Sequence, residues 1–173
     1  MHIRRARAED AASILPIMDD ARSFQRSCGF FQWHDGHPSM EEILDDISAG
    51  ACYVLTDDEG IVGSFSVFYG ADPSYALIED GSWMNPTDRY LTVHRVAVAD
   101  RARGRGAAGR IFQYAYDMCP GLGALSLRVD THHQNKAMRK AAEKFGFTLC
   151  GVIYVEDGTP RAAYEKIYKE GEE

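Results

Sequence analysis

Apolar residues recur with two different spacings along this chain, and the change between them predicts where helices and strands lie. Helical spacing first occurs over residues 9–27, where five apolar side chains share one face: Ile14, Ile17, Met18, Ala21 and Phe24. Pro16 lies inside this stretch and predicts a kink or a break. A second helix is expected to begin at Ser39, which has the capping-box spacing to Glu42, and to end before Gly50.

Strand-like runs make up most of the remaining chain. They are predicted over residues 2–7, 51–56, 61–69, 90–98, 124–129, 147–155 and 161–168. The turn residues Asp57–Gly60 and Glu156–Gly158 indicate hairpins between the flanking runs. Helical spacing returns over 108–119, where Pro120-Gly121 is a stop signal, and again over 135–145.

The order of these elements predicts the fold class. Antiparallel strands come first, then one strand–helix–strand crossover whose two strands should lie parallel, and last a C-terminal hairpin. We therefore expect a mixed α/β (α+β) sheet. With 173 residues, the simplest organisation is a single domain over residues 1–173.

Composition narrows the functional classes. The formal net charge of −7 argues against nucleic acid as a partner, and no segment has the roughly 20 apolar residues that cross a bilayer, so no membrane partner is expected. His132 and His133 point in different directions from an extended chain and have no third ligand, so no metal site is expected. No C-x-x-C pair occurs and no export signal begins the chain, so we expect a cytoplasmic protein with free thiols at Cys28, Cys52, Cys119 and Cys150.

Positive charge is concentrated in the stretch Arg101–Arg110 (RARGRGAAGR), which has four arginines and no acid. It follows the predicted strand 90–98 and opens the next helix. A glycine-rich turn at that place directs backbone N–H groups at one point and attracts phosphate. Arginine in a first helical turn opposes the helix dipole, so a merely solvated helix start does not explain the pattern. The stretch predicts a phosphate site.

The same glycines, Gly104-x-Gly106-x-x-Gly109, match the dinucleotide fingerprint, and Asp130 lies about 20 residues further on, where a ribose-binding acid is expected. Two features disfavour an NAD-dependent enzyme: polar residues 100–103 separate the strand from the glycines, and only one crossover is predicted. An NAD-dependent enzyme stays an alternative function.

Read with its flanks, Val96–Gly106 (VAVADRARGRG) resembles the acetyl-CoA signature of the GNAT superfamily of N-acetyltransferases, a strand followed by Arg/Gln-x-x-Gly-x-Gly/Ala at the mouth of a helix. Leu127–Asn135 (LRVDTHHQN) resembles the strand and asparagine that follow there. Ala141–Phe147 (AAEKFGF) resembles the closing Tyr-Glu-Lys-x-Gly-Phe run. The element order also fits from His2 to Tyr168. The resemblance implies a GNAT-like fold with acetyl-CoA as the acyl donor.

The resemblance also implies roles for individual residues. The backbone of Val96, Ala97 and Val98 would pair with the pantetheine arm like an extra strand. Six consecutive N–H groups would hold the pyrophosphate: those of Arg103, Gly104, Arg105, Gly106, Ala107 and Ala108. Asn135 would contact the arm from the far side. Arg101, Arg105 or Lys144 would meet the 3′-phosphate.

The implied reaction is direct attack of a primary amine on the thioester carbonyl. Since such an amine has a pKa near 10.4, about 1 molecule in 2,500 is neutral at pH 7, which is roughly 4.6 kcal/mol of the barrier. A general base is therefore useful. His94, two residues before Val96, is the first candidate, as arylalkylamine N-acetyltransferases of this superfamily carry a histidine at the matching strand position. Glu79 is the second, acting directly or through water. The alternative for His94 is a partly buried histidine that only pairs with a neighbouring carboxylate. The alternative for Glu79 is a surface acid beside Asp80 without a catalytic role.

Where many family members have a tyrosine as general acid, this chain has Ala142. The acid is therefore not assigned. Tyr154 could replace it, or the thiolate leaves unaided, since a thiol pKa is about 8.5. A catalytically idle acyl-CoA-binding regulatory protein is the alternative function.

Phe31, Trp33 and Trp83 are expected to line the acceptor pocket, because the superfamily's variable N-terminal helix and loop cover that site; core or subunit packing is the alternative. Nearby acids favour a cationic acceptor: Asp35, Glu41, Glu42, Asp45 and Asp46. Whether the amine belongs to a small molecule or a peptide stays open, as does a homodimer.

Overall fold

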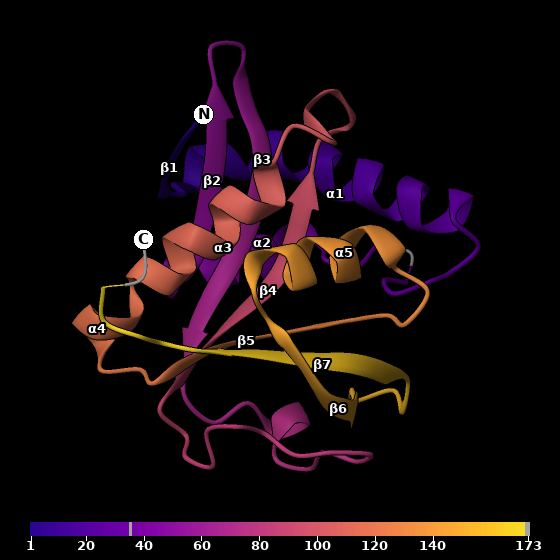
Figure 1. The fold of residues 1–173 in the computed structure, drawn as a ribbon. Coiled ribbons are helices and arrows are strands. Elements are labelled where there is room, and N and C mark those ends of the chain that lie inside the picture. The colour runs from indigo at the N-terminus through magenta and orange to yellow at the C-terminus, as the bar shows by residue number, and fades with distance from the viewer. Residues whose placement is uncertain (35, 172–173) are drawn as a thin grey trace. The chain divides into compact units, whose positions relative to one another are not determined.

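Among the described residues, seven strands form one sheet in the order β1-β2-β3-β4-β5-β7-β6 (Figure 1). The computed structural model describes residues 1–34 and 36–171. The strands are β1 (His2–Arg5), β2 (Cys52–Asp57), β3 (Gly60–Tyr69), β4 (Tyr90–Val98), β5 (Ser126–Thr131), β6 (Thr148–Tyr154) and β7 (Pro160–Ile167). The helices are α1 (Ala11–Ser27), α2 (Met40–Ser48), α3 (Ala107–Asp117), α4 (Cys119–Leu122) and α5 (Lys136–Phe145), with short 3-10 turns η1 (Ala8–Asp10), η2 (Pro73–Tyr75) and η3 (Asp100–Ala102).

Strand directions confirm the predicted mixed sheet. β1 and β2 are antiparallel, as are β2 and β3, and Asp57 pairs with Gly60 across the predicted hairpin. β4 and β5 are parallel, so the predicted crossover is present. β7 pairs antiparallel with both β5 and β6, which gives the predicted C-terminal hairpin.

The chain forms two compact units. Unit 1 comprises Met1–Val67 and His94–Ile111, and unit 2 comprises Phe68–Val93 and Phe112–Glu173. β3, β4 and α3 pass from one unit into the other. The single domain expected over 1–173 stays a prediction.

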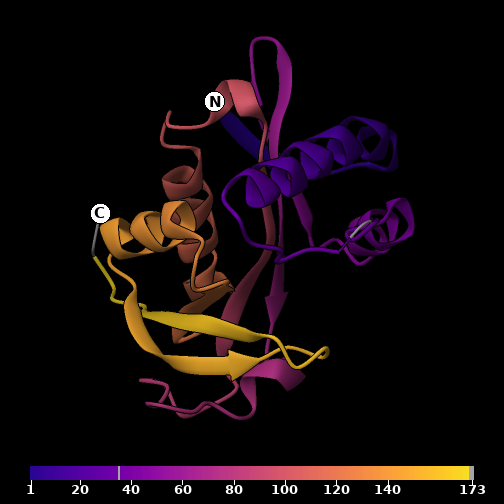
Figure 2. The same ribbon diagram turned by 90° about the vertical axis from the view of Figure 1, so that its right-hand side faces the viewer.

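In unit 1, α1 and α2 lie on the same side of β2 and β3 (Figure 2). Their apolar faces meet β2 and the end of β4 in a core that includes Ile14, Ile17, Met18, Trp33, Ile43, Val54 and Ala97. The capping box predicted for α2 is present: the Glu42 N–H donates to Ser39 Oγ at 3.2 Å, and the Ser39 N–H donates to Glu42 Oε2 at 2.8 Å.

Two features of α1 differ from the sequence prediction. α1 is one continuous helix across Pro16, so the predicted break is absent and a kink there stays a prediction. The helix also begins after the predicted start near Glu9, at Ala11. Asp10 accepts the Arg7 N–H at 2.7 Å and pairs with Arg4 Nη1 at 2.7 Å, and this arrangement accompanies the 3-10 turn η1.

The helix predicted to stop at Pro120 ends earlier and restarts. α3 ends at Asp117, and the short α4 then runs through Pro120 until Gly123, whose φ is +69°. Proline is tolerated in a first helical turn because its missing N–H has no intrahelical acceptor there. No helix within residues 1–34 and 36–171 has both the length and the apolar character to cross a bilayer.

In unit 2, a buried carboxylate fixes the irregular segment 71–88 to the sheet. Glu165 on β7 is fully buried and accepts from Arg128 Nε at 2.8 Å and from Ser126 Oγ at 2.7 Å. Its other oxygen accepts the N–H groups of Met84 at 2.6 Å and Asn85 at 3.1 Å. Four donors thus compensate the desolvation of one carboxylate.

Replacing Glu165 with Gln should destabilise the protein, because the Arg128 guanidinium then stays buried without its counter-charge. We expect the free energy of unfolding, measured by urea denaturation, to fall by about 3–5 kcal/mol. Glu156→Gln, at an exposed turn acid, is the control and should change it by less than about 0.5 kcal/mol. A loss below about 1 kcal/mol for Glu165→Gln would show that this network contributes little.

All four cysteines are free thiols, as predicted; Cys28 is exposed, whereas Cys52, Cys119 and Cys150 are buried. Burial raises the pKa of the buried three, that of Cys119 to about 12. Because the thiolate is the reactive form, one thiol should react quickly with a disulfide reagent in native protein, and all should react in denaturant. Cys28→Ser should remove the fast phase. A second fast thiol would contradict this assignment.

Candidate functional site

The turn between β4 and α3 contains two glycines with positive φ. Gly104 and Gly106 have φ values of +75° and +79°, in the left-handed region that glycine adopts without strain. An ideal Cβ at either position meets no atom within 4 Å. These glycines therefore serve backbone conformation rather than close packing, and the surface above them is open.

Backbone N–H groups gather at this turn. α3 begins at Ala107, so Ala107 and Ala108 lie in the first turn, where a helix provides no acceptor for its own N–H groups. Two of the six predicted pyrophosphate donors already have acceptors. The Arg103 N–H donates to Asp100 O at 3.2 Å, and the Arg105 N–H donates to Ala102 O at 3.4 Å.

Two of the four arginines hold the turn in place. Arg101 makes a bidentate pair with Asp57 in the β2–β3 hairpin, at 2.7 and 3.1 Å. The guanidinium holds the pKa of the Asp57 carboxyl below its usual value, and the carboxylate raises the pKa of Arg101. Arg103 donates to Asp100 Oδ1 at 2.6 Å and to Asp20 O at 2.8 Å. Its guanidinium also lies 4.6 Å from the centre of the Phe24 ring.

Arg105 and Arg110 differ from that pair. Both are exposed, and neither has an ion-pair partner within the part of the chain that the structure describes. Lys144, the other residue expected near the 3′-phosphate, is exposed in the last turn of α5, in unit 2. The positive charge of unit 1's turn that has no ion-pair partner among the described residues thus comes from Arg105 and Arg110.

The end of β4 carries the strand residues expected to pair with pantetheine. The parallel ladder with β5 runs from Tyr90–Ser126 to Thr92–Arg128, so His94 and 96–98 lie beyond its last pair. Ala97 is buried against the α1–α2 core. Val98 packs against a second cluster formed by Leu55, Val62, Ala102 and Ala107. His94 and Val96 are half-buried, and His94 has interactions within the protein.

Glu79 lies in unit 2, whereas His94 belongs to unit 1. The Glu79 backbone pairs with Val152 of β6 through two 2.8 Å hydrogen bonds. The negative charge of its exposed carboxylate raises the pKa of the Tyr154 phenol. The segment approaches β6 so closely that a Cβ at Gly81 would lie 1.9 Å from Cys150 O.

Asn135 caps α5: its side chain accepts the Met138 N–H at 3.2 Å. Ala142, at the position of the family tyrosine, is buried. Sequence reasoning missed Tyr164 of β7, which is fully buried and bonds to two side chains of α5. Its hydroxyl accepts from Arg139 Nε at 2.9 Å and donates to Glu143 Oε1 at 3.1 Å. Strand alternation along 161–168 could have indicated an inward tyrosine there.

The three aromatics expected at the acceptor pocket have different surroundings. Phe31 is 63% exposed, while Trp33 is buried in the α1–α2 core. Gln25 Oε1 fixes this loop by accepting the Trp33 N–H at 3.1 Å. Trp83, in unit 2, donates to Tyr75 O at 2.9 Å and lies 4.1 Å from the Arg128 guanidinium. Packing therefore accounts for both tryptophans, and their acceptor role stays a prediction.

The predicted acidic surface is smaller than its sequence suggests. Glu42 and Asp46 point toward Arg95 of β4, whereas Glu41 and Asp45 are exposed. Asp35 lies outside the described residues. The described residues contain no group of three His, Cys, Asp or Glu side chains that could hold a metal ion.

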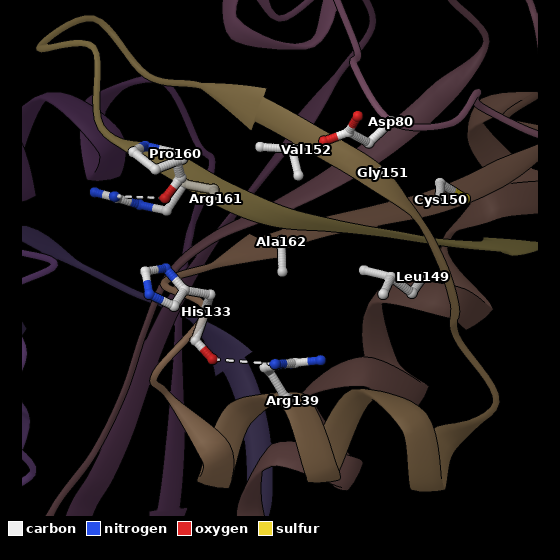
Figure 3. Close-up of a pocket in the computed structure, with 10 residues that line it drawn as sticks. All are labelled: Asp80, His133, Arg139, Leu149, Cys150, Gly151, Val152, Pro160, Arg161 and Ala162. Atoms are coloured by element: carbon white, nitrogen blue, oxygen red, sulfur yellow. Dashed lines mark hydrogen bonds between the residues drawn. The ribbon is translucent and has the colours of Figure 1, made fainter.

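Unit 2 also has a cavity of about 390 Å³ beside α5, β6 and β7 (Figure 3). Its apolar lining includes Leu149, Val152 and Ala162. Along one side, Arg139 Nη1 donates to His133 O at 3.1 Å. None of the predicted catalytic, cofactor or acceptor residues lines this cavity.

Known proteins of one family are similar to this chain in sequence and in fold. The family model described as "Acetyltransferase (GNAT) family" matches residues 18–147. A solved GNAT-family acetyltransferase from Streptococcus agalactiae 2603 is 32% identical with a TM-score of 0.87, covering 98% of this chain and 96% of that one. A solved acetyltransferase structure from Staphylococcus aureus Mu50 is 25% identical with a TM-score of 0.72, covering 98% and 100%.

A curated relative, the uncharacterized N-acetyltransferase YhfO of Bacillus subtilis strain 168, is 25% identical over 147 residues, which are 85% of this chain and 89% of that protein. The family model covers the β4–α3 turn and the whole of α5, and the solved structures extend the match over nearly the whole chain. The chain therefore belongs to the GNAT family and is an acetyl-CoA-dependent acyltransferase.

Proposed function

We propose that this enzyme transfers the acetyl group of acetyl-CoA to a primary amine of a small molecule or peptide, by direct attack of the amine on the thioester. The observation that carries the proposal is the open β4–α3 turn. Gly104 and Gly106 hold it in a left-handed conformation, and α3 begins immediately after it. Such a turn is a ready site for a diphosphate.

The residues of the turn fit coenzyme A. Its diphosphate would accept from the N–H groups of Gly104, Gly106, Ala107 and Ala108, where the helix dipole also favours negative charge. Arg105 and Arg110 are exposed and supply cationic side chains for the phosphates. Arg101 and Arg103 would hold the turn in place and not contact the phosphates, because their guanidinium groups already pair with carboxylates.

The rest of the cofactor would follow the strand. The backbone of Val96, Ala97 and Val98 would pair with the amides of the pantetheine arm, as an added strand does. Asn135 would contact the arm with its amide nitrogen, since its oxygen caps α5. The thioester would then lie near the start of this strand segment, next to His94.

His94 is the proposed general base. It would accept a proton from the attacking ammonium group, directly or through water, and so raise the small neutral fraction of the amine at pH 7. Glu79, whose carboxylate is exposed in unit 2, is the second candidate. The leaving thiolate needs less assistance, since its pKa is about 8.5, and Ala142 offers no proton.

The free thiols of all four cysteines are compatible with a reducing compartment, so we assign the activity to the cytoplasm. A binding protein without activity would bind acetyl-CoA but release no thiol in the presence of amines. That measurement separates the two functions.

Gly104→Glu and Gly106→Glu should each weaken acetyl-CoA binding by at least about tenfold, because a carboxylate would repel the diphosphate. Isothermal titration calorimetry measures the Kd. Gly158→Glu is a matched control: Gly158 has a φ of +78° and equally open surroundings, but lies in the β6–β7 turn. It should change the Kd by less than about twofold. Unchanged binding in both turn variants would refute the turn as the diphosphate site.

His94→Ala should lower turnover by about 10²–10⁴-fold and flatten the pH–rate profile, with little change in acetyl-CoA affinity. An amine panel with detection of released thiol, repeated across pH, measures this. His2→Ala, at an exposed histidine of β1, is the control and should keep the wild-type profile. If His94→Ala keeps that profile too, the base lies elsewhere, and Glu79→Gln becomes the next variant.

A further inference from the structure

Arg95 has an unusual backbone for a strand residue. Its φ is +53°, in the left-handed region that side chains other than glycine rarely adopt, yet it lies inside β4 between His94 and Val96. Such a conformation persists only where neighbouring groups hold it. Side chains from another element should therefore hold Arg95.

Two carboxylates of α2 contact the Arg95 guanidinium. Arg95 Nη1 donates to Asp46 Oδ2 at 2.5 Å, and Nη2 lies 3.7 Å from Glu42 Oε1. Glu42 and Asp46 are four residues apart, so both carboxylates project from the same helix face. They form an acidic clamp on one guanidinium, and this pair of residues is called the α2 clamp below.

Both members of the α2 clamp are themselves held. Asp46 is buried and also accepts from Ser66 Oγ of β3 at 2.6 Å. Glu42 accepts the Ser39 N–H as part of the helix cap, and His37 Nδ1 lies 2.8 Å from its other oxygen. The clamp is therefore a rigid support that links α2 and β3 to β4 within unit 1.

The conformation of Arg95 determines how β4 presents its neighbours. The φ and ψ of this residue orient the peptide groups on either side, which include the His94 carbonyl and the Val96 N–H. They also set the direction in which the His94 side chain leaves the strand relative to residues 96–98. These are the groups that the proposed function uses.

We propose that Asp46 and Glu42 are positioning residues for acetyl transfer: by clamping Arg95, they hold β4 in the left-handed conformation that presents the His94 side chain and the Val96 amide. This inference rests on the proposed function. It also gives these acids a role different from attracting a cationic acceptor.

A double-mutant cycle tests the clamp. Glycine adopts positive φ without support, so Arg95→Gly should preserve the strand while making the clamp unnecessary. Asp46→Asn should lower kcat/KM by about tenfold or more in the Arg95 background, but by less than about twofold in the Arg95→Gly background. Glu42→Gln, which removes the more distant contact, should show the same coupling with a smaller loss. Asp58→Asn, at an exposed turn acid, is the control.

A direct readout separates the clamp from the proposed function. The three-bond coupling and nuclear Overhauser effects of the residue 95 amide report the sign of φ by NMR without any substrate. Loss of the positive φ in Asp46→Asn or Glu42→Gln, with folding intact by circular dichroism, supports the clamp. Retention of positive φ in both variants overturns it, as would equal losses of kcat/KM in the Arg95 and Arg95→Gly backgrounds. If instead φ responds as expected while His94→Ala keeps its pH profile, the proposed catalytic role of His94 fails and the clamp stands.

Discussion

The site depends on the anchoring of one exposed turn from both sides. Arg101 pairs with Asp57 of the β2–β3 hairpin, and Arg103 joins Asp100 to the backbone of α1 at Asp20. Without such anchors, the turn would lose conformational freedom on binding a diphosphate, and that cost would be subtracted from the affinity. Exposed ion pairs contribute little stability singly. Their value here is that they fix the direction of N–H groups that have no other partner in the helix.

The same use of charge recurs at two more places in the molecule. The α2 clamp holds Arg95 in a conformation that its own backbone disfavours. Glu165 collects four donors and thereby fixes the irregular segment that carries Glu79 and Trp83. In each case a carboxylate with several partners helps to fix the conformation of the backbone that carries its partners. These charged groups therefore hold backbone in place and are not assigned a chemical step.

This division of roles agrees with the chemistry of acetyl transfer. At pH 7 an amine of pKa about 10.4 must lose a proton before it attacks, whereas a thiol of pKa about 8.5 leaves with a smaller penalty. The reaction therefore needs a general base for the amine more than it needs a general acid for the thiolate. A chain with Ala142 in place of the family tyrosine can still follow this route, provided that the amine reaches a base beside the thioester.

Local sequence determined much of this protein. The capping box at Ser39 and the hairpin at Asp57–Gly60 depend on neighbouring residues, and each was predicted from them. The same local character made the glycine-rich turn recognisable as the family signature. Errors occurred where local signals were weak, as at Pro120, which is accommodated inside a short helix.

Tertiary structure alone decided the partners of the charged side chains. Arg101 and Asp57 are 44 residues apart, Arg95 and Asp46 are 49 apart, and no periodicity in the sequence relates them. The sequence therefore indicated four arginines for the phosphates, and the fold engaged two of them as anchors. It likewise placed Trp33 in the α1–α2 core and Trp83 against Arg128, contacts that the sequence did not indicate. The physical reason is that a side chain's role depends on which group neutralises it or covers it, and chain folding brings that group from a distant segment.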